Sequence, residues 1–146
     1  MKRGDQMKSL SVKLRVILIG LIIFGYAEAW GANWKLFATN ATGRFYYDAE
    51  SITRPSKGVV IVWEKIVFTE KGVIDVVGDL GEKFKTLNHL RNLSEFHCAD
   101  KNFRVLSTVM YSTHGITLES YNYQEPKWNP IIPESVYDIL YNILCK

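Results

Sequence analysis

Hydrophobic and polar residues alternate along much of the chain with a period of two, which is typical of β-strands, whose successive side chains point to opposite faces. The strongest run spans residues 59–68, where β-branched and aromatic side chains dominate. Alternation divides its apolar residues between one face, with Ile61, Trp63 and Val67, and the other, with Val60, Val62, Ile66 and Phe68. Because both faces are apolar, this run predicts a central strand that is covered on both sides.

Shorter runs flank the central strand. Residues 34–39 and 44–48 predict a hairpin around the turn at 40–43, which contains Asn and Gly. A second turn is expected at 55–58. Strands predicted at 93–99, 103–112 and 116–123 are joined by short turns, which indicates an antiparallel meander.

The stretch 70–93 between these two groups favours a loop followed by a short helix. Asp79 and Glu82 have the spacing of a capping box. The glycines that favour the loop are Gly72, Gly78 and Gly81. The apolar residues that would line one face of the helix are Phe84, Leu87 and Leu90.

The period changes to that of an α-helix at the end of the chain. Pro133 suits the first helical position and Glu134 the first turn, where the helix dipole favours negative charge. The apolar residues that follow with helical spacing are Val136, Ile139, Leu140, Ile143 and Leu144. The predicted fold is therefore α+β: an antiparallel sheet of about six strands with a C-terminal α-helix packed on one face.

The N-terminal residues differ in character from the rest. Basic residues precede an uncharged apolar run at 16–25, and Ala27-Glu28-Ala29 follows it, which is the pattern of a cleavable secretory signal. The run is shorter than the roughly twenty residues of a membrane-spanning helix. An uncleaved membrane anchor is the alternative. We therefore expect residues 1–29 to be a signal peptide and residues 30–146 to be one exported domain.

Charge and cysteine content change with this division. The chain has 18 basic and 15 acidic residues, and the predicted signal takes five basic and two acidic ones, so the domain keeps thirteen of each. A domain of zero net charge gives no support to nucleic-acid binding. Its two cysteines, Cys98 and Cys145, predict a disulfide in an exported chain. The alternatives are two free thiols or, less compatible with two ligands, a zinc site.

No set of residues predicts catalysis, a metal site or a cofactor. The histidines, His89, His97 and His114, lack metal-binding spacing. His97 and Cys98 are neighbours on a strand, so their side chains point to opposite faces and cannot form a nucleophilic pair. Glu64 lies in the most apolar strand, where we expect it to pair with a Lys or Arg across the sheet.

Aromatic residues are abundant, at 13% of the chain. Tyr and Trp are favoured in binding surfaces, whereas the alternative is ordinary strand preference and core packing. The candidate binding surface comprises Tyr46, Tyr47, Tyr121, Tyr123 and Trp128.

A spaced pattern covers nearly the whole predicted domain. It consists of Trp34, Tyr47-Asp48, Ser51-Ile52, Val62-Trp63, Cys98, Arg104-Val105-Leu106, Tyr111, Gly115, Trp128, Ile131-Ile132-Pro133, Ser135 and Cys145. In this pattern the chain resembles the bacterial surface-adhesin protein E family. The resemblance implies an antiparallel sheet with a disulfide-tied C-terminal helix, a tendency to form homodimers, and binding of host matrix proteins and plasminogen.

The resemblance also bears on location. The family's named member is held in the outer membrane by lipid on a cysteine at the first mature position, which here is Trp30, and no cysteine precedes Cys98. We therefore expect a periplasmic or secreted protein that is not a lipoprotein. The leading hypothesis is a non-enzymatic binding domain with a protein partner, and the alternative is a periplasmic accessory or structural protein of the cell envelope.

Overall fold

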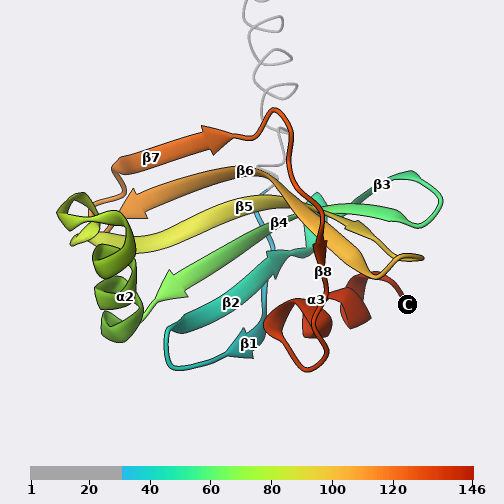
Figure 1. Cartoon of the computed structure of the whole chain (residues 1–146), viewed down its shortest axis with the longest axis horizontal. Helices are drawn as coiled ribbons and strands as arrows, with labels where there is room; N and C mark the ends of the chain where they lie inside the picture. Colours follow the sequence, from blue (N-terminus) through green and yellow to red (C-terminus); the bar gives the residue numbers. More distant parts are fainter. Residues whose placement is uncertain (1–30) are drawn as a thin grey trace, which may run out of the picture. The chain divides into compact units, whose positions relative to one another are not determined.

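The computed structural model describes residues 31–146, in which one antiparallel sheet carries two α-helices (Figure 1). The predicted signal peptide lies outside the described residues. The elements are β1 (Trp34–Thr39), β2 (Gly43–Asp48), the 3₁₀ turn η1 (Ala49–Ser51), β3 (Thr53–Ser56), β4 (Val59–Phe68), α2 (Glu70–Leu80), the 3₁₀ turn η2 (Glu82–Phe84), β5 (Leu87–His97), β6 (Asn102–Ser112), β7 (Thr117–Asn122), β8 (Asn129–Pro130) and α3 (Val136–Leu144).

The strands follow the order β1-β2-β4-β5-β6-β7, and every pair is antiparallel. Two short strands lie off this path: β3 pairs with the first residues of β4, and β8 pairs with the start of β6. The predicted hairpin, the central strand and the meander are therefore confirmed. The central strand has the predicted bounds, because its β-branched run is flanked by turn residues on one side and by a helix cap on the other.

The prediction for residues 70–93 is wrong. Residues 70–80 form α2, whose first turn is capped by the Thr69 hydroxyl accepting from the Gly72 backbone N–H. Gly72 serves close packing, because a Cβ atom there would lie 2.0 Å from the Thr42 carbonyl oxygen. Leu87 and Leu90, which we expected on a helix, belong to β5.

The C-terminal helix is confirmed, but it begins later than predicted. Ser135 is its N-cap and accepts from the Asp138 backbone N–H, so the first helical residue is Val136. Glu134 has a φ of 64° and lies outside the helix. Pro133 lies two residues before the cap and is not the first helical residue; its ring restricts the backbone φ angle at that position. Within residues 31–146, neither α2 nor α3 has the length and hydropathy that crossing a membrane requires.

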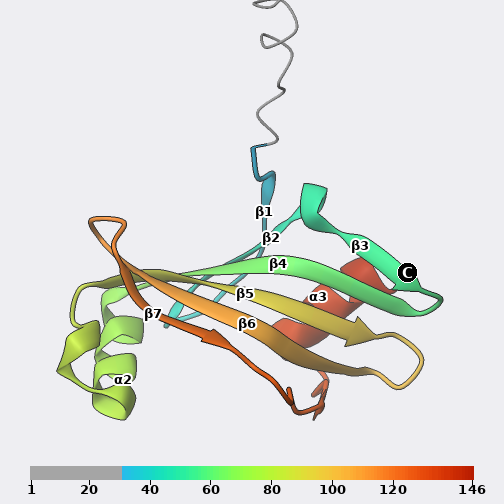
Figure 2. The same cartoon turned by 90° about the horizontal axis from the view of Figure 1, so that it is seen from above.

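Both helices pack on the same face of the sheet, at opposite ends of its strands (Figures 1 and 2). Under α3 lies a core of Val60, Val62, Phe96, Ile131, Leu140 and Leu144. Under α2 and η2 lies a second core of Phe84, Leu87, Leu90 and Met110. The expectation that β4 is covered on both faces is therefore wrong. Its other apolar residues, Ile61, Trp63 and Val67, stay half-buried because side chains of neighbouring strands, rather than a second layer, surround them.

Candidate binding site

The face of the sheet opposite α2 and α3, called here the open face, carries a row of side chains across four strands. Tyr46 of β2 lies opposite Lys65 of β4, which lies opposite Arg91 of β5, which lies opposite Val109 of β6. Strand alternation places these side chains on one face because their neighbours along each strand point towards the helices. A basic pair in the middle of the sheet is thereby set beside aromatic rings.

Two further rings, of Trp34 in β1 and Tyr111 in β6, lie beside the two cations. We call the resulting set, in which rings and cations alternate, the cation–aromatic row. It consists of Tyr46, Lys65, Trp34, Arg91 and Tyr111. Lys65 Nζ lies 5.0 Å from the centre of the Tyr46 ring and 4.4 Å from that of Trp34. Arg91 Cζ lies 5.6 Å from the centre of the Trp34 ring and 5.2 Å from that of Tyr111. Cations held over ring faces in this way are stabilised by the ring quadrupole.

A cavity of about 260 Å³ opens beside this row. Its lining consists of Ala32, Trp34, Asp48, Trp63, Arg91, Val109 and Tyr111. Asp48 is the only carboxylate of the lining, and its Oδ1 accepts from the backbone N–H groups of Asn33 at 2.8 Å and Glu50 at 3.1 Å. The cavity therefore combines apolar walls with a few polar groups, as small binding sites in proteins do.

The electrostatics of the row are dominated by basic groups. Burial, and then the neighbouring Arg91 charge, lower the pKa of Lys65. The pKa of His89, whose ring stacks on Tyr111 at 4.8 Å, is lowered by burial and by the charges of Arg91 and Lys65. Arg91 Nε is buried and has no hydrogen-bond partner among the described residues. Within residues 31–146 neither Lys65 nor Arg91 forms an ion pair, although the Asp48 carboxylate lines the same cavity.

The aromatic residues proposed from the sequence fall into separate places. Tyr46 belongs to the cation–aromatic row, whereas Tyr47 points to the opposite face and packs against the core under α3. Tyr121 and Tyr123, near the β7 edge, are exposed and stack on each other with ring centres 6.3 Å apart.

Trp128 lies over the guanidinium of Arg104, 4.4 Å from its Cζ, and meets the His97 ring edge-on at 6.0 Å. Arg104 in turn donates from Nε and Nη2 to the same carboxylate oxygen of Glu95, at 3.1 and 2.8 Å. This arginine on the open face is therefore both stacked on a ring and paired with a carboxylate.

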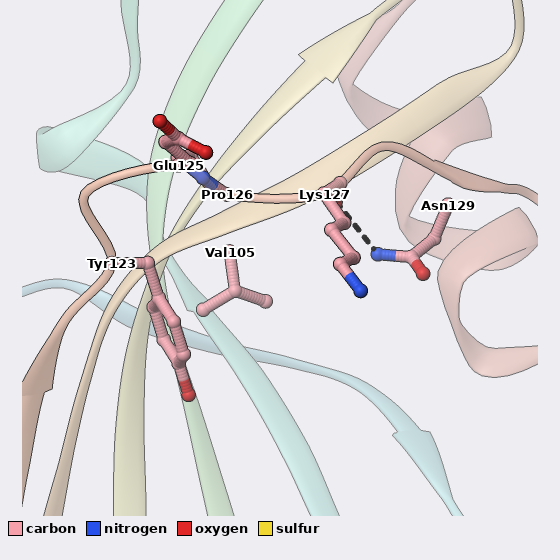
Figure 3. A pocket seen from close by; sticks show the side chains of 6 residues that line it. All are labelled: Val105, Tyr123, Glu125, Pro126, Lys127 and Asn129. Atoms are coloured by element: carbon pink, nitrogen blue, oxygen red, sulfur yellow. Dashed lines mark hydrogen bonds between the residues drawn. The ribbon is translucent and has the colours of Figure 1, made fainter.

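A second cavity, of about 330 Å³, lies beside the segment that follows β7 (Figure 3). Tyr123 and Val105 form its apolar part, and Asn129 donates to the Lys127 carbonyl oxygen at 3.0 Å. The remaining lining residues are Glu125 and Pro126. Its polar groups face outward and are mostly exposed, so this cavity offers fewer fixed contacts than the one beside Arg91.

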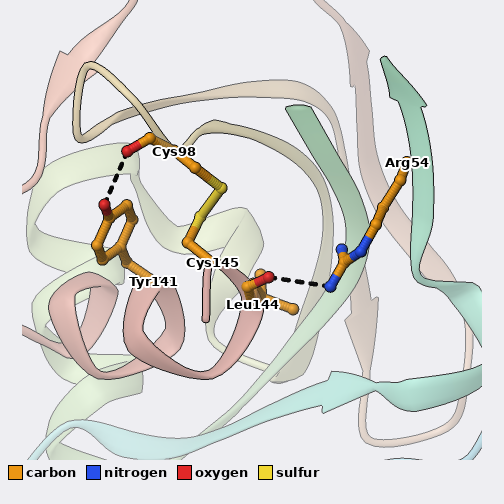
Figure 4. The surroundings of a disulfide bond; sticks show 5 residues. All are labelled: Arg54, Cys98, Tyr141, Leu144 and Cys145. Atoms are coloured by element: carbon orange, nitrogen blue, oxygen red, sulfur yellow. Dashed lines mark hydrogen bonds between the residues drawn. A yellow bond between two sulfur atoms is a disulfide. The ribbon is translucent and has the colours of Figure 1, made fainter. Parts of the chain in front are cut away.

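The predicted disulfide between Cys98 and Cys145 is present, with Cα atoms 5.5 Å apart (Figure 4). It joins the segment just after β5 to the residue that follows α3, since the helix ends at Leu144. The Tyr141 hydroxyl donates to the Cys98 carbonyl oxygen at 2.8 Å, and Arg54 Nη2 donates to the Leu144 carbonyl oxygen at 3.0 Å. The second contact places positive charge at the C-terminus of a helix, where the dipole favours it.

Glu64 does not pair with a basic residue, contrary to the expectation from the sequence. It points towards α3 between the two cores, with only 4% of its surface exposed, and its strand neighbours are Tyr47 and Asn92. Burial raises the pKa of its carboxyl to about 7, and the nearby Ser94 hydroxyl opposes this rise only in part. Because its Oε1 is enclosed, Glu64 is a buried polar group of the core and cannot contact a substrate at the surface.

The other groups considered from the sequence are dispersed. His89 lies on the open face, His97 lies 2.8 Å from Asp100, and His114 is in the turn between β6 and β7. Within residues 31–146, no three His, Cys, Asp or Glu side chains are close enough together to hold a metal ion.

The surface-adhesin protein E family model matches residues 34–146. The chain belongs to this family. Two crystal structures of protein E from Haemophilus influenzae share its fold. One, from a non-typeable strain, has a TM-score of 0.54 and 15% identity and covers 81% of this chain and 78% of its own. The other, crystal form II, has a TM-score of 0.54 and 16% identity and covers 79% and 88%. No curated protein matches the chain by sequence.

Four residues of the pattern that carried the family resemblance line the open-face cavity: Trp34, Asp48, Trp63 and Tyr111. Sequence reasoning missed the two cations between them. Lys65 could have been found, because it follows Trp63 at the spacing that places both on one face of β4. Arg91 could not, because it lies in the stretch whose strand was not predicted.

Proposed function

We propose that this member of the surface-adhesin protein E family is an exported, non-enzymatic binding domain that engages a protein partner through its open face. The cation–aromatic row and the cavity beside it carry this proposal. Tyr, Trp and Arg are the residues that most often dominate the binding energy of protein interfaces. Here they are packed together on a sheet face that no helix of residues 31–146 covers.

The chemistry of the described residues supports binding over catalysis. Glu64, whose carboxyl has a raised pKa, is enclosed in the core, and both cysteines are joined in the disulfide. Catalysis requires an accessible group with a partner that activates it, and neither the buried acid nor the disulfide provides one.

The family resemblance makes host matrix proteins and plasminogen the first partners to test, with homodimer formation as a further property of the proposal. An accessory protein of the periplasm is the second candidate. The residue after the predicted cleavage site favours it, because Trp30 cannot carry a lipid as a cysteine at that position can.

Binding of the domain comprising residues 30–146 to immobilised plasminogen and to basement-membrane extract tests the proposal. Trp34→Ala and Tyr111→Ala should each weaken binding at least about tenfold, as loss of a central aromatic contact does. Lys57→Ala, which removes an exposed charge in the β3–β4 turn, is the control and should bind like the unmodified domain. Melting temperatures establish that each variant is folded.

Equal binding by the aromatic variants and the control would refute the open face as the binding surface. If the unmodified domain binds neither preparation, a host partner is rejected and the periplasmic candidate is favoured. In that case osmotic shock of the native host should release the protein, and protease added to intact cells should leave it uncut.

A further inference from the structure

Two arginines on the open face are stacked on aromatic rings, but only one of them has an acidic partner. Arg104 lies over Trp128 and donates from two nitrogens to Glu95. Arg91 lies between Trp34 and Tyr111, and none of its nitrogens forms an ion pair with a described residue. Both guanidinium groups lie over aromatic rings, but only that of Arg104 is paired with a carboxylate.

The rings beside Arg91 restrict how its guanidinium can bind. A guanidinium between two aromatic side chains loses little freedom when it binds a ligand, because its plane is already set. Its edge then presents parallel N–H donors, an arrangement that matches the two oxygens of a carboxylate. Its Nε is buried, so an acceptor that enters the cavity can reach only the two Nη groups, which form the edge used here.

The surrounding charges favour an anion in this cavity. Lys65 lies beside Arg91 in the same row. The cavity's own carboxylate, Asp48, accepts through Oδ1 from the backbone N–H groups of Asn33 and Glu50. Positive charge concentrated beside a partly apolar cavity raises the local concentration of anionic ligands.

We propose that the open-face cavity binds an acidic side chain of the partner protein, whose carboxylate accepts from the Nη groups of Arg91. Lys65 attracts the same group without being its main contact. This inference rests on the proposed function, since it names the chemistry of the partner at the same surface. The apolar walls formed by Trp63 and Val109 suit the methylene groups of a Glu side chain.

A matched pair of peptides tests this inference directly. The probe is the peptide Ac-Gly-Glu-Leu-Glu-Gly-NH2, and its control has Gln in place of both Glu. Each is titrated into the ¹⁵N-labelled domain of residues 30–146, and the Arg Nε–H and Trp Nε1–H signals are followed by NMR. The Glu peptide should shift the signals of Arg91 and Trp34, and the Gln peptide should bind at least about tenfold more weakly, as loss of a charged hydrogen bond predicts.

Variants separate a specific contact from a general field. Arg91→Lys keeps the charge but loses the planar donor pair, so it should weaken binding of the Glu peptide about tenfold, as Arg91→Ala also should. Lys57→Ala keeps the site and should bind normally. If Arg91→Ala proves unfolded by its melting curve, the Lys variant alone decides.

Equal affinity of the two peptides, or unchanged binding by Arg91→Lys, would overturn the inference. So would a heparin octasaccharide that shifts the Arg91 signal when the Glu peptide does not, because the ligand would then be a sulfated sugar. These outcomes are separable from failure of the proposed function: if Trp34→Ala loses binding to the host proteins while Arg91→Lys retains it, the open face binds its partner without this carboxylate.

Discussion

Replacing the buried Glu64 by Gln should make the domain less sensitive to pH. The carboxyl lies between the two cores with Asn92 and Tyr47 beside it in the sheet and Tyr137 above it in α3. No ion pair reaches it among the described residues, and Tyr137 is itself so buried that its pKa is raised well above the usual range, so it stays neutral. Gln has nearly the same shape and cannot ionise.

The magnitude follows from the pKa of Glu64, which burial raises from 4.5 to about 7. The folded protein therefore holds a proton that the unfolded chain releases between these pH values, so the free energy of unfolding falls as pH rises through this range. One pKa unit corresponds to about 1.4 kcal/mol, so the loss between pH 5 and pH 8.5 is about 2 to 3 kcal/mol. This loss of free energy of unfolding is nearly complete above pH 7, where Glu64 ionises in the folded state as well.

Urea unfolding with the disulfide intact measures this effect. The difference in free energy of unfolding between Glu64→Gln and the unmodified domain should increase by about 2 to 3 kcal/mol from pH 5 to pH 8.5, in favour of the variant at high pH. Glu125→Gln removes an exposed carboxylate and serves as control, with a difference that stays nearly constant. If the Glu64→Gln difference is equally flat, the buried carboxyl is not protonated at neutral pH and the reasoning is refuted.

Three further predictions concern stability. Cys98→Ser should cost about 4 kcal/mol, the entropy of a loop of this length, and equal melting temperatures with and without reductant would contradict it. Gly72→Ala should destabilise the domain by at least about 2 kcal/mol, because its Cβ would collide with the Thr42 carbonyl. Gly78→Ala, whose Cβ would contact nothing, should stabilise α2 by about 0.5 to 1 kcal/mol. Thermal melts that rank the two variants in the opposite order would refute this packing. Ser135→Ala should cost about 1 kcal/mol through loss of the α3 cap, and an unchanged urea midpoint would show that the cap contributes nothing.

The elements predicted correctly are those whose residue pattern is uniform over several turns or pleats. Eight of the ten residues of β4 are apolar and six of these are β-branched, and the stripe of α3 has one period along its whole length. The prediction for the α2 region was wrong because its glycines were interpreted as evidence for a loop. Gly72 allows the helix to approach the β1–β2 turn, a contact with a residue thirty positions earlier that local composition does not reveal.

The candidate site shows the same division. The aromatic residues of the open face are visible in the sequence, but their grouping is not, since Tyr46 and Tyr47 are adjacent in the chain and lie on opposite faces of the sheet. Arg91 of β5 reaches Trp34 of β1 across the two strands that lie between them, β2 and β4. This contact depends on the register in which the strands pair. Glu64 could be recognised as unusual, but its lack of a basic partner depends on which strands flank it.

The strands of the hairpin and meander, the C-terminal helix and two cysteines able to pair follow from local features, because side-chain period and turn chemistry act over a few residues. The packing of both helices on one face of the sheet follows instead from long-range contacts. That choice depends on how the loops after β4 and β8 return to the sheet and on which of two apolar faces gains more buried surface, and these are sums over contacts between residues far apart in the chain.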